Sequence, residues 1–170
     1  MLFELKHSFV LALLVLVSAC GVAPEKKAPW PASVRLENLT DVEQSRITQS
    51  LKQISTTLGI ELFNFDSRPS QFQLTITRMT PEGRNVSQAG VATYNGTFCK
   101  VELNELVLQS SYSSYFEPVL WHEIGHCSGM EHVENSKEIM YPFANPRSFY
   151  SETSISSFFQ SLLNYTSLTK

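Results

Sequence analysis

The sequence is poor in histidine and cysteine: its 170 residues include four histidines and three cysteines. It also lacks a membrane-spanning helix, because the apolar run at residues 9–17 is far shorter than the roughly 20 residues that a bilayer requires. No basic stripe is present and the formal net charge is −3, so we expect no nucleic-acid partner. The absence of repeats and low-complexity tracts favours one globular domain at this length.

Residues 9–17 have the length of a signal-peptide core, with Lys6 before them. The run ends in Val17-Ser18-Ala19-Cys20, which resembles a bacterial lipobox. The resemblance implies that residues 1–19 are a lipoprotein signal peptide and that Cys20 carries a lipid. We therefore expect an exported lipoprotein anchored to a membrane of the bacterial cell envelope. The outer membrane and the cell surface are two options, and the sequence leaves the choice of membrane open. An ordinary secretory signal cut nearby and an uncleaved buried strand are the alternatives.

Residues 20–32 are expected to be the lipidated cysteine and a short tether, because three prolines and two adjacent lysines lie there. This segment is too short to hold an inhibitory prodomain. The folded domain is then expected to cover residues 33–170, with a weak first strand at its start.

A helix is predicted after this strand, because Thr40 and Glu43 form a capping box and Gly59 can end the helix. Strands are predicted over residues 60–65, over 72–77 as a half-buried strand, and over 90–94 and 97–103 as a hairpin with a type I′ turn at Asn95-Gly96. The apolar positions of the helix are taken to be Val42, Ile47, Leu51, Ile54 and Leu58.

Three of the four histidines lie in one stretch of expected helix and turn. His122 and His126 are four residues apart, so on a helix they share one face, with Glu123 beside them. Gly129 allows the helix to stop and turn, which lets His132 return to the same point. Three imidazoles leave a fourth position open for water, as a catalytic zinc site requires. The alternative is a helix with ordinary surface histidines.

The spacing H-E-x-x-H-x-x-G-x-x-H, followed by Ile139-Met140-Tyr141-Pro142, resembles the metzincin metallopeptidases. The resemblance implies a zincin-type α/β (α+β) domain with a mixed, mostly parallel twisted sheet, one antiparallel edge strand, an active-site helix, a Met-turn and a C-terminal helix. It also implies one catalytic Zn²⁺ on His122, His126 and His132, with Met140 beneath the metal. The sequence looks more like a matrixin than an astacin, because Pro142 stands where astacin- and serralysin-like members carry a tyrosine. Val133 follows the third histidine where many members carry a polar or acidic residue, so the subfamily stays open.

The active-site helix is predicted to begin near residues 116–118, since proline suits a first turn. Glu123 is poorly placed to bind the metal but can take a proton from its water as a general base. We therefore predict a monomeric zinc-dependent endopeptidase acting on a peptide or protein substrate. The family resemblance implies that the peptide lies along residues 89–94, beside a pocket wall at residues 142–149. Ordinary core packing would explain the aromatic residues of that wall equally well.

Two other functions remain open. A zinc-containing envelope lipoprotein could bind a protein partner without cleaving it, although the presence of Glu123 argues against this. A structural lipoprotein could carry the motif by accident, although the expected Met-turn at Met140 argues against that.

The two cysteines other than Cys20 are candidates for a disulfide, because an exported chain keeps such bonds. Cys99 lies on a predicted strand that leads toward the helix, and the helical rotation points Cys127 toward the sheet. Two buried free thiols are the alternative.

Overall fold

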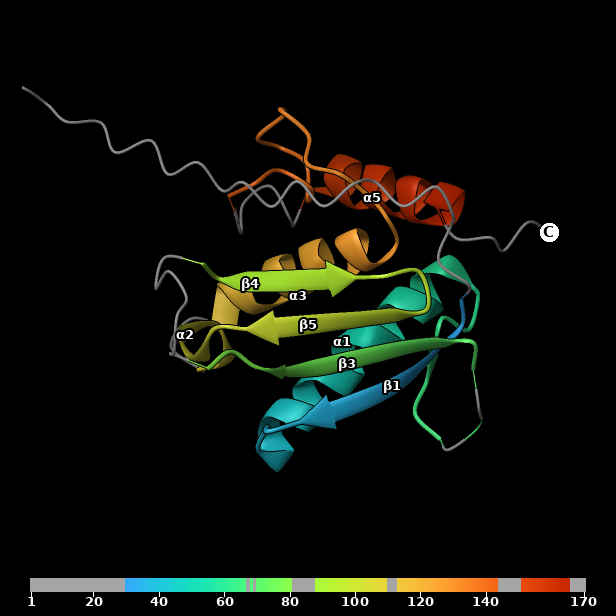
Figure 1. Ribbon diagram of the computed structural model, residues 1–170. Helices are drawn as coiled ribbons and strands as arrows, with labels where there is room; N and C mark the ends of the chain where they lie inside the picture. The colour runs from blue at the N-terminus through green and yellow to red at the C-terminus, as the bar shows by residue number, and fades with distance from the viewer. Residues whose placement is uncertain are drawn as a thin grey trace, which may run out of the picture.

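The computed structural model describes residues 30–66, 68, 70–80, 88–109, 113–143 and 151–165. In this part of the chain five strands form one sheet in the order β2-β1-β3-β5-β4. Figure 1 labels β1, β3, β5 and β4 side by side in this order. The pairs of the sheet are parallel except for the antiparallel edge pair β4–β5, which confirms the predicted fold class. The elements are β1 (Ala32–Glu37), α1 (Asp41–Leu58), β2 (Phe63–Asn64), β3 (Phe72–Arg78), β4 (Gly90–Tyr94), β5 (Phe98–Leu103), α2 (Glu105–Leu108), α3 (Ser113–Cys127) and α5 (Glu152–Tyr165).

Helix α1 begins and ends where its sequence predicts. Thr40 accepts a hydrogen bond from the backbone of Glu43 and donates its own N–H to the Glu43 carboxylate, so the capping box is confirmed. Gly59 ends the helix at φ +66°. Val42, however, is 78% exposed, and its assignment to the apolar face is wrong. At about 100° per residue, Val42 lies roughly 140° around the helix from Ile47.

The hairpin between β4 and β5 is antiparallel as predicted, with Tyr94 opposite Cys99. The predicted type I′ turn is wrong, because that turn needs positive φ at both central residues and Asn95 does not have it. Only Gly96 does, at +91°. The Asn95 side chain instead accepts a hydrogen bond from the Phe98 backbone N–H at 3.0 Å.

Two strand predictions differ from the structure, one in the length of the strand and the other in its burial. The strand expected over residues 60–65 is confined to Phe63–Asn64, because β1 offers only Ala32 and Ser33 as parallel partners. In β3 both faces are largely buried: Thr75 and Thr77 are 7% and 5% exposed on the face opposite the helices. This strand lies between β1 and β5, so neighbouring side chains cover both of its faces.

Helix α3 begins before the predicted start at residues 116–118, which places Pro118 inside the helix. Its ring removes one backbone hydrogen bond, so the preceding turn needs other support. Phe116 provides it: the ring is 1% exposed, and the Arg46 guanidinium of α1 lies 3.8 Å from its centroid. The short helix α2 was also not predicted; the Asn104 side chain accepts from the Leu106 N–H at its start.

The core lies between one face of the sheet and helices α1 and α3, which Figure 1 shows behind the strands. The predicted C-terminal helix is present as α5 and packs its phenylalanines on Trp121 of α3, with ring centroids 5.3 and 5.8 Å apart. At the other end of the chain, Trp30 is 6% exposed and Ala32 is fully buried. The last residues of the expected tether therefore belong to the packed domain.

Several sequence predictions lie outside the described residues: the signal peptide, the lipid on Cys20, and the aromatic segment from residue 144 to residue 150. Among the residues that are described, no helix is both long enough and apolar enough to cross a membrane.

Candidate metal centre

Helix α3 and the turn after it bring three histidines to one point. His122 and His126 lie one helical turn apart, and α3 ends at Cys127. Gly129 has φ +91°, and its N–H donates to the His126 carbonyl at 2.9 Å. The Met130 N–H donates back to the Gly125 carbonyl at 3.0 Å, which closes the turn. The chain reverses there, so His132 returns toward the helix.

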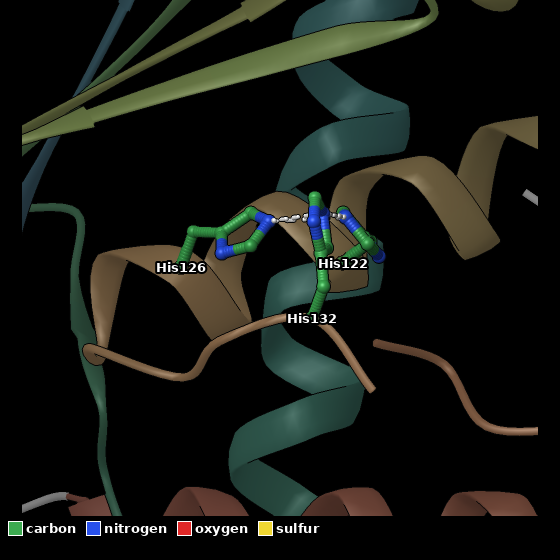
Figure 2. Close-up of side chains that lie close together, drawn as sticks. All are labelled: His122, His126 and His132. Carbon is green, nitrogen blue, oxygen red and sulfur yellow. Dashed lines mark hydrogen bonds between the residues drawn. The ribbon is translucent and has the colours of Figure 1, made fainter. Parts of the chain in front are cut away.

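The three Nε2 atoms form a triangle with sides of 3.1 Å (Figure 2). In a tetrahedral zinc site with Zn–N bonds of about 2.0–2.1 Å, the nitrogens lie about 3.3–3.4 Å apart. The triangle therefore fits one zinc ion after an opening of a few tenths of an ångström. His122, His126 and His132 are thus positioned to bind a metal ion.

Backbone carbonyls fix the tautomers of two of these histidines. His122 Nδ1 lies 2.8 Å from the Ile139 oxygen, and His126 Nδ1 lies 2.8 Å from the Met130 oxygen. A carbonyl only accepts, so each Nδ1 is the donor, and a neutral imidazole then has an unprotonated Nε2. Lone pairs that face each other at 3.1 Å repel unless a cation lies among them. The donor set therefore suits zinc.

The local environment also keeps these imidazoles neutral. The pKa of His122 is lowered to about 3, mainly by burial and additionally by repulsion from charged His126, against the hydrogen bond to Ile139, which raises it. Burial lowers the pKa of His126 and of the more exposed His132 as well. Metal ligands must be unprotonated, and these shifts keep them so at neutral pH.

The segment after the helix supports the histidines through its backbone. The Ile139 carbonyl holds His122, and the Met140 carbonyl accepts from the N–H of Val133, the residue after His132, at 3.1 Å. Met140 is 3% exposed, and its side chain packs against Gly125 of α3. The predicted Met-turn residue therefore lies directly against the helix that carries two of the histidines.

Glu123 lies between α3 and the edge strand β4 and is 6% exposed. A Cβ at Gly90 would lie 2.8 Å from Glu123 Oε1, so the glycine lets the carboxyl pack on the strand backbone. Burial raises the pKa of Glu123 to about 8, against a hydrogen bond from the Ala92 backbone that lowers it. A general base works best with a pKa near the working pH, and a nearby cation would favour its charged form.

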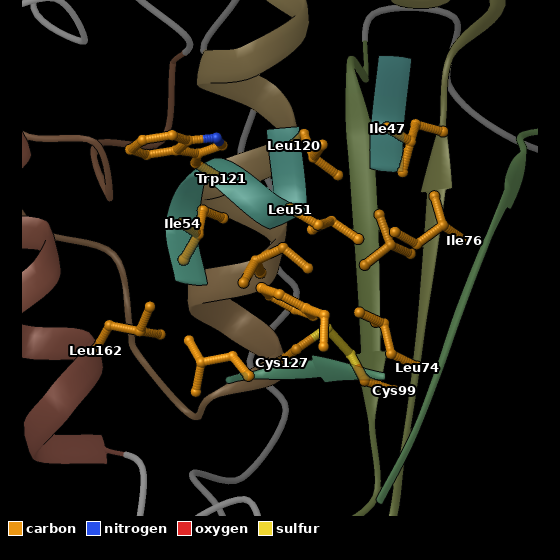
Figure 3. Packing of buried hydrophobic residues seen from close by; sticks show 14 of the residues in the cluster. Ile47, Leu51, Ile54, Leu74, Ile76, Cys99, Leu120, Trp121, Cys127 and Leu162 are labelled. Atoms are coloured by element: carbon orange, nitrogen blue, oxygen red, sulfur yellow. A yellow bond between two sulfur atoms is a disulfide. The ribbon is translucent and has the colours of Figure 1, made fainter. Parts of the chain in front are cut away.

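A disulfide joins the end of α3 to the sheet. Cys99 of β5 and Cys127 are both fully buried and bonded to each other, with Cα atoms 5.5 Å apart (Figure 3). Cys127 follows His126 directly, so the bond fixes the helix next to a candidate ligand.

The structure brings the predicted residues His122, Glu123, His126, His132 and Met140 into one region. Of the predicted pocket wall, Phe143 is 61% exposed, with its ring centroid 5.7 Å from that of Tyr141. Sequence reasoning missed the carbonyls that fix the histidines, because every residue has one. It also missed Gly90 and Gly125, of which Gly125 has a visible signal: a glycine inside a helix.

Comparison with known protein families gives a match to the family described as Matrixin over residues 41–156, more than half of the chain. The matched range includes all three histidines, Glu123 and Met140. No curated protein matches the sequence.

Proposed function

We propose that this chain, which belongs to the matrixin family of zinc metallopeptidases, is a zinc-dependent endopeptidase. The observation that carries the proposal is the convergence of three imidazole nitrogens 3.1 Å apart, with a buried carboxyl on the same helix. His122, His126 and His132 would hold the metal. Zinc bound there supplies a Lewis acid that acidifies water and polarises the scissile carbonyl.

Glu123 is the proposed general base. Its carboxylate accepts the proton of the attacking water and then gives it to the leaving amine as the peptide bond breaks. The contact with Gly90 and the hydrogen bond from the Ala92 backbone hold this side chain against β4, so its carboxyl does not swing freely in solvent. Its place one residue after His122 puts it beside the ligands without making it one of them.

The edge strand β4 is the proposed docking site for the substrate backbone. Ala89 and Asn95 make backbone hydrogen bonds to the β5 side. Because these bonds alternate along an antiparallel pair, the backbone groups of Gly90, Ala92 and Tyr94 point away from β5. The Ala92 N–H already donates to Glu123, so the groups of Gly90 and Tyr94 and the Ala92 carbonyl are those offered to a peptide. An extended peptide can pair with such an edge as an added strand.

We further propose that a lipid on Cys20 holds the enzyme at the bacterial envelope.

Replacement of Glu123 tests whether the protein cleaves peptides. Glu123→Ala and Glu123→Gln should keep one zinc per chain but lose at least about a hundredfold in hydrolysis of a peptide library, since general acid–base catalysis is typically worth 10² to 10⁴-fold. Phenanthroline should inhibit the wild type. The control Glu131→Gln changes an exposed carboxylate in the turn after α3 and should leave turnover unchanged.

Equally slow turnover by the wild type and Glu123→Ala, with zinc bound in both, would contradict the proposed endopeptidase activity. The protein would then be a zinc-containing domain that binds a partner without cleaving it.

A further inference from the structure

Gly125 lies inside helix α3, between the two histidines that the helix contributes. Glycine is the least favourable residue in a helix interior after proline, because it loses the most backbone entropy. Nothing at this position requires a left-handed backbone, since its φ is that of the surrounding helix. The missing side chain, and not the backbone, is therefore the feature to explain.

A side chain at this position would collide with the Met-turn. A Cβ built on Gly125 would overlap Met140 Sδ, lie 3.1 Å from Met140 Cε and lie 3.3 Å from a ring carbon of Phe158. Met140 is 3% exposed and Phe158 is 2% exposed, so neighbouring side chains enclose both of them. A methyl group on Gly125 would therefore push the turn at Ile139 and Met140 away from α3.

The same turn holds two of the three histidines. The Ile139 carbonyl lies 2.8 Å from His122 Nδ1, and the Met140 carbonyl accepts from the Val133 N–H at 3.1 Å, next to His132. A displaced turn would remove the carbonyl that orients the His122 ring, and it would shift the segment that carries His132. His126 would keep its own acceptor, the Met130 carbonyl.

We infer that Gly125 is a positioning residue of the metal centre: its missing side chain lets the Met-turn lie against α3, where two turn carbonyls hold His122 and the segment carrying His132. This inference rests on the proposed zinc site. A purely structural role for Gly125 would affect the stability of the protein but not the zinc affinity of the folded state.

The test compares Gly125→Ala, Met140→Ala and the double variant in the full chain, by competition titration with a zinc chelator. Gly125→Ala should bind zinc at least about tenfold more weakly, because groups that orient ligands are typically worth 10- to 100-fold in affinity. Removing the Met140 side chain makes room for the new methyl group. The double variant should therefore bind within about threefold of Met140→Ala alone.

Two further measurements separate positioning from stability. Co²⁺ substituted for zinc should give a changed visible spectrum in Gly125→Ala, which reports altered ligand geometry, and the double variant should regain the spectrum of Met140→Ala. The control Gly59→Ala adds a methyl group at φ +66° with nothing within 4 Å, so it lowers stability far from the site. Its zinc affinity and Co²⁺ spectrum should match those of the wild type.

Zinc binding by Gly125→Ala within twofold of the wild type would overturn the inference, as would a double variant as weak as Gly125→Ala. A Gly125→Ala variant that fails to fold would assign Gly125 a purely structural role and would likewise overturn the inference. Failure of the wild type to bind zinc would instead remove the proposed function.

Discussion

His122 donates its Nδ1 proton to the Ile139 carbonyl, and this bond decides which ring nitrogen faces the other two histidines. The ring is 9% exposed, so a protonated imidazole there would be a buried cation beside two further imidazoles. This cost appears as a pKa lowered to about 3 from an ordinary 6.5. In the unfolded chain the same ring is in water and binds its proton normally.

The metal-free protein should therefore lose stability in acid. Between pH 6.5 and about 3 the unfolded state binds a proton at residue 122 that the folded state does not, so the free energy of unfolding falls as the pH falls through this range. His122→Asn should flatten this decline. Glu123, with its pKa raised to about 8, acts in the opposite sense above about pH 4.5, so both proteins should carry Glu123→Gln.

The measurement is urea unfolding in the presence of a chelator at a series of pH values. Each unit of pKa shift corresponds to about 1.4 kcal/mol, so the two curves should separate clearly below pH 6. Parallel curves would show that His122 is not held neutral in the folded state.

At the scale of residues, the sequence predicts which side chains come together better than it predicts the backbone groups that hold them. The spacing of His122, His126 and His132 is enough to place three imidazoles together, because helix geometry and one glycine turn determine it. The carbonyls of Met130 and Ile139 carry no such signal, since every residue offers the same backbone oxygen. Packing of the whole turn decides which carbonyl comes within reach.

At the scale of elements, local rules succeed where the interaction is local. The capping box of Thr40 and Glu43 spans one turn of helix, and α1 begins there as predicted. The start of α3 could not be predicted in the same way. Proline favours a first turn, but Pro118 lies inside α3. Phe116 in the turn before it packs under Arg46, a contact between residues far apart in sequence.

The disulfide between α3 and β5 gives a prediction for these elements. It closes a loop with a sequence separation of 28 residues, so replacing both cysteines with alanine should lower the free energy of unfolding by about 3.6 kcal/mol on the chain-entropy model. Urea unfolding of the wild type and of Cys99→Ala/Cys127→Ala measures the loss. Thiol labelling of the unfolded, unreduced wild type is the control, and reaction at Cys99 and Cys127 would disprove the bond.

At the scale of the whole molecule, the packed domain begins earlier than its sequence indicates. Trp30 packs edge-on against Phe63 and Phe72, with ring centroids 5.3 and 5.0 Å away. A tether from a lipid on Cys20 would therefore have about ten residues, which span at most roughly 35 Å when fully extended. We propose that the metal centre works within a few nanometres of a membrane surface.

The anchor is tested by Cys20→Ser, which should move the protein from the membrane fraction to the soluble fraction. Both proteins should carry Glu123→Gln, so that self-cleavage of the tether does not release the domain. Mass spectrometry of the membrane-bound protein should show a lipid on an N-terminal Cys20. An unmodified N-terminus beyond Cys20 would contradict the proposed lipid anchor.

The bond between Cys99 and Cys127 encloses α2, nearly all of α3, His122, Glu123 and His126. A single backbone cut anywhere between the two cysteines therefore leaves both pieces covalently joined. This closed ring means that a nick in the segment that carries His122 and His126 does not separate the chain into fragments.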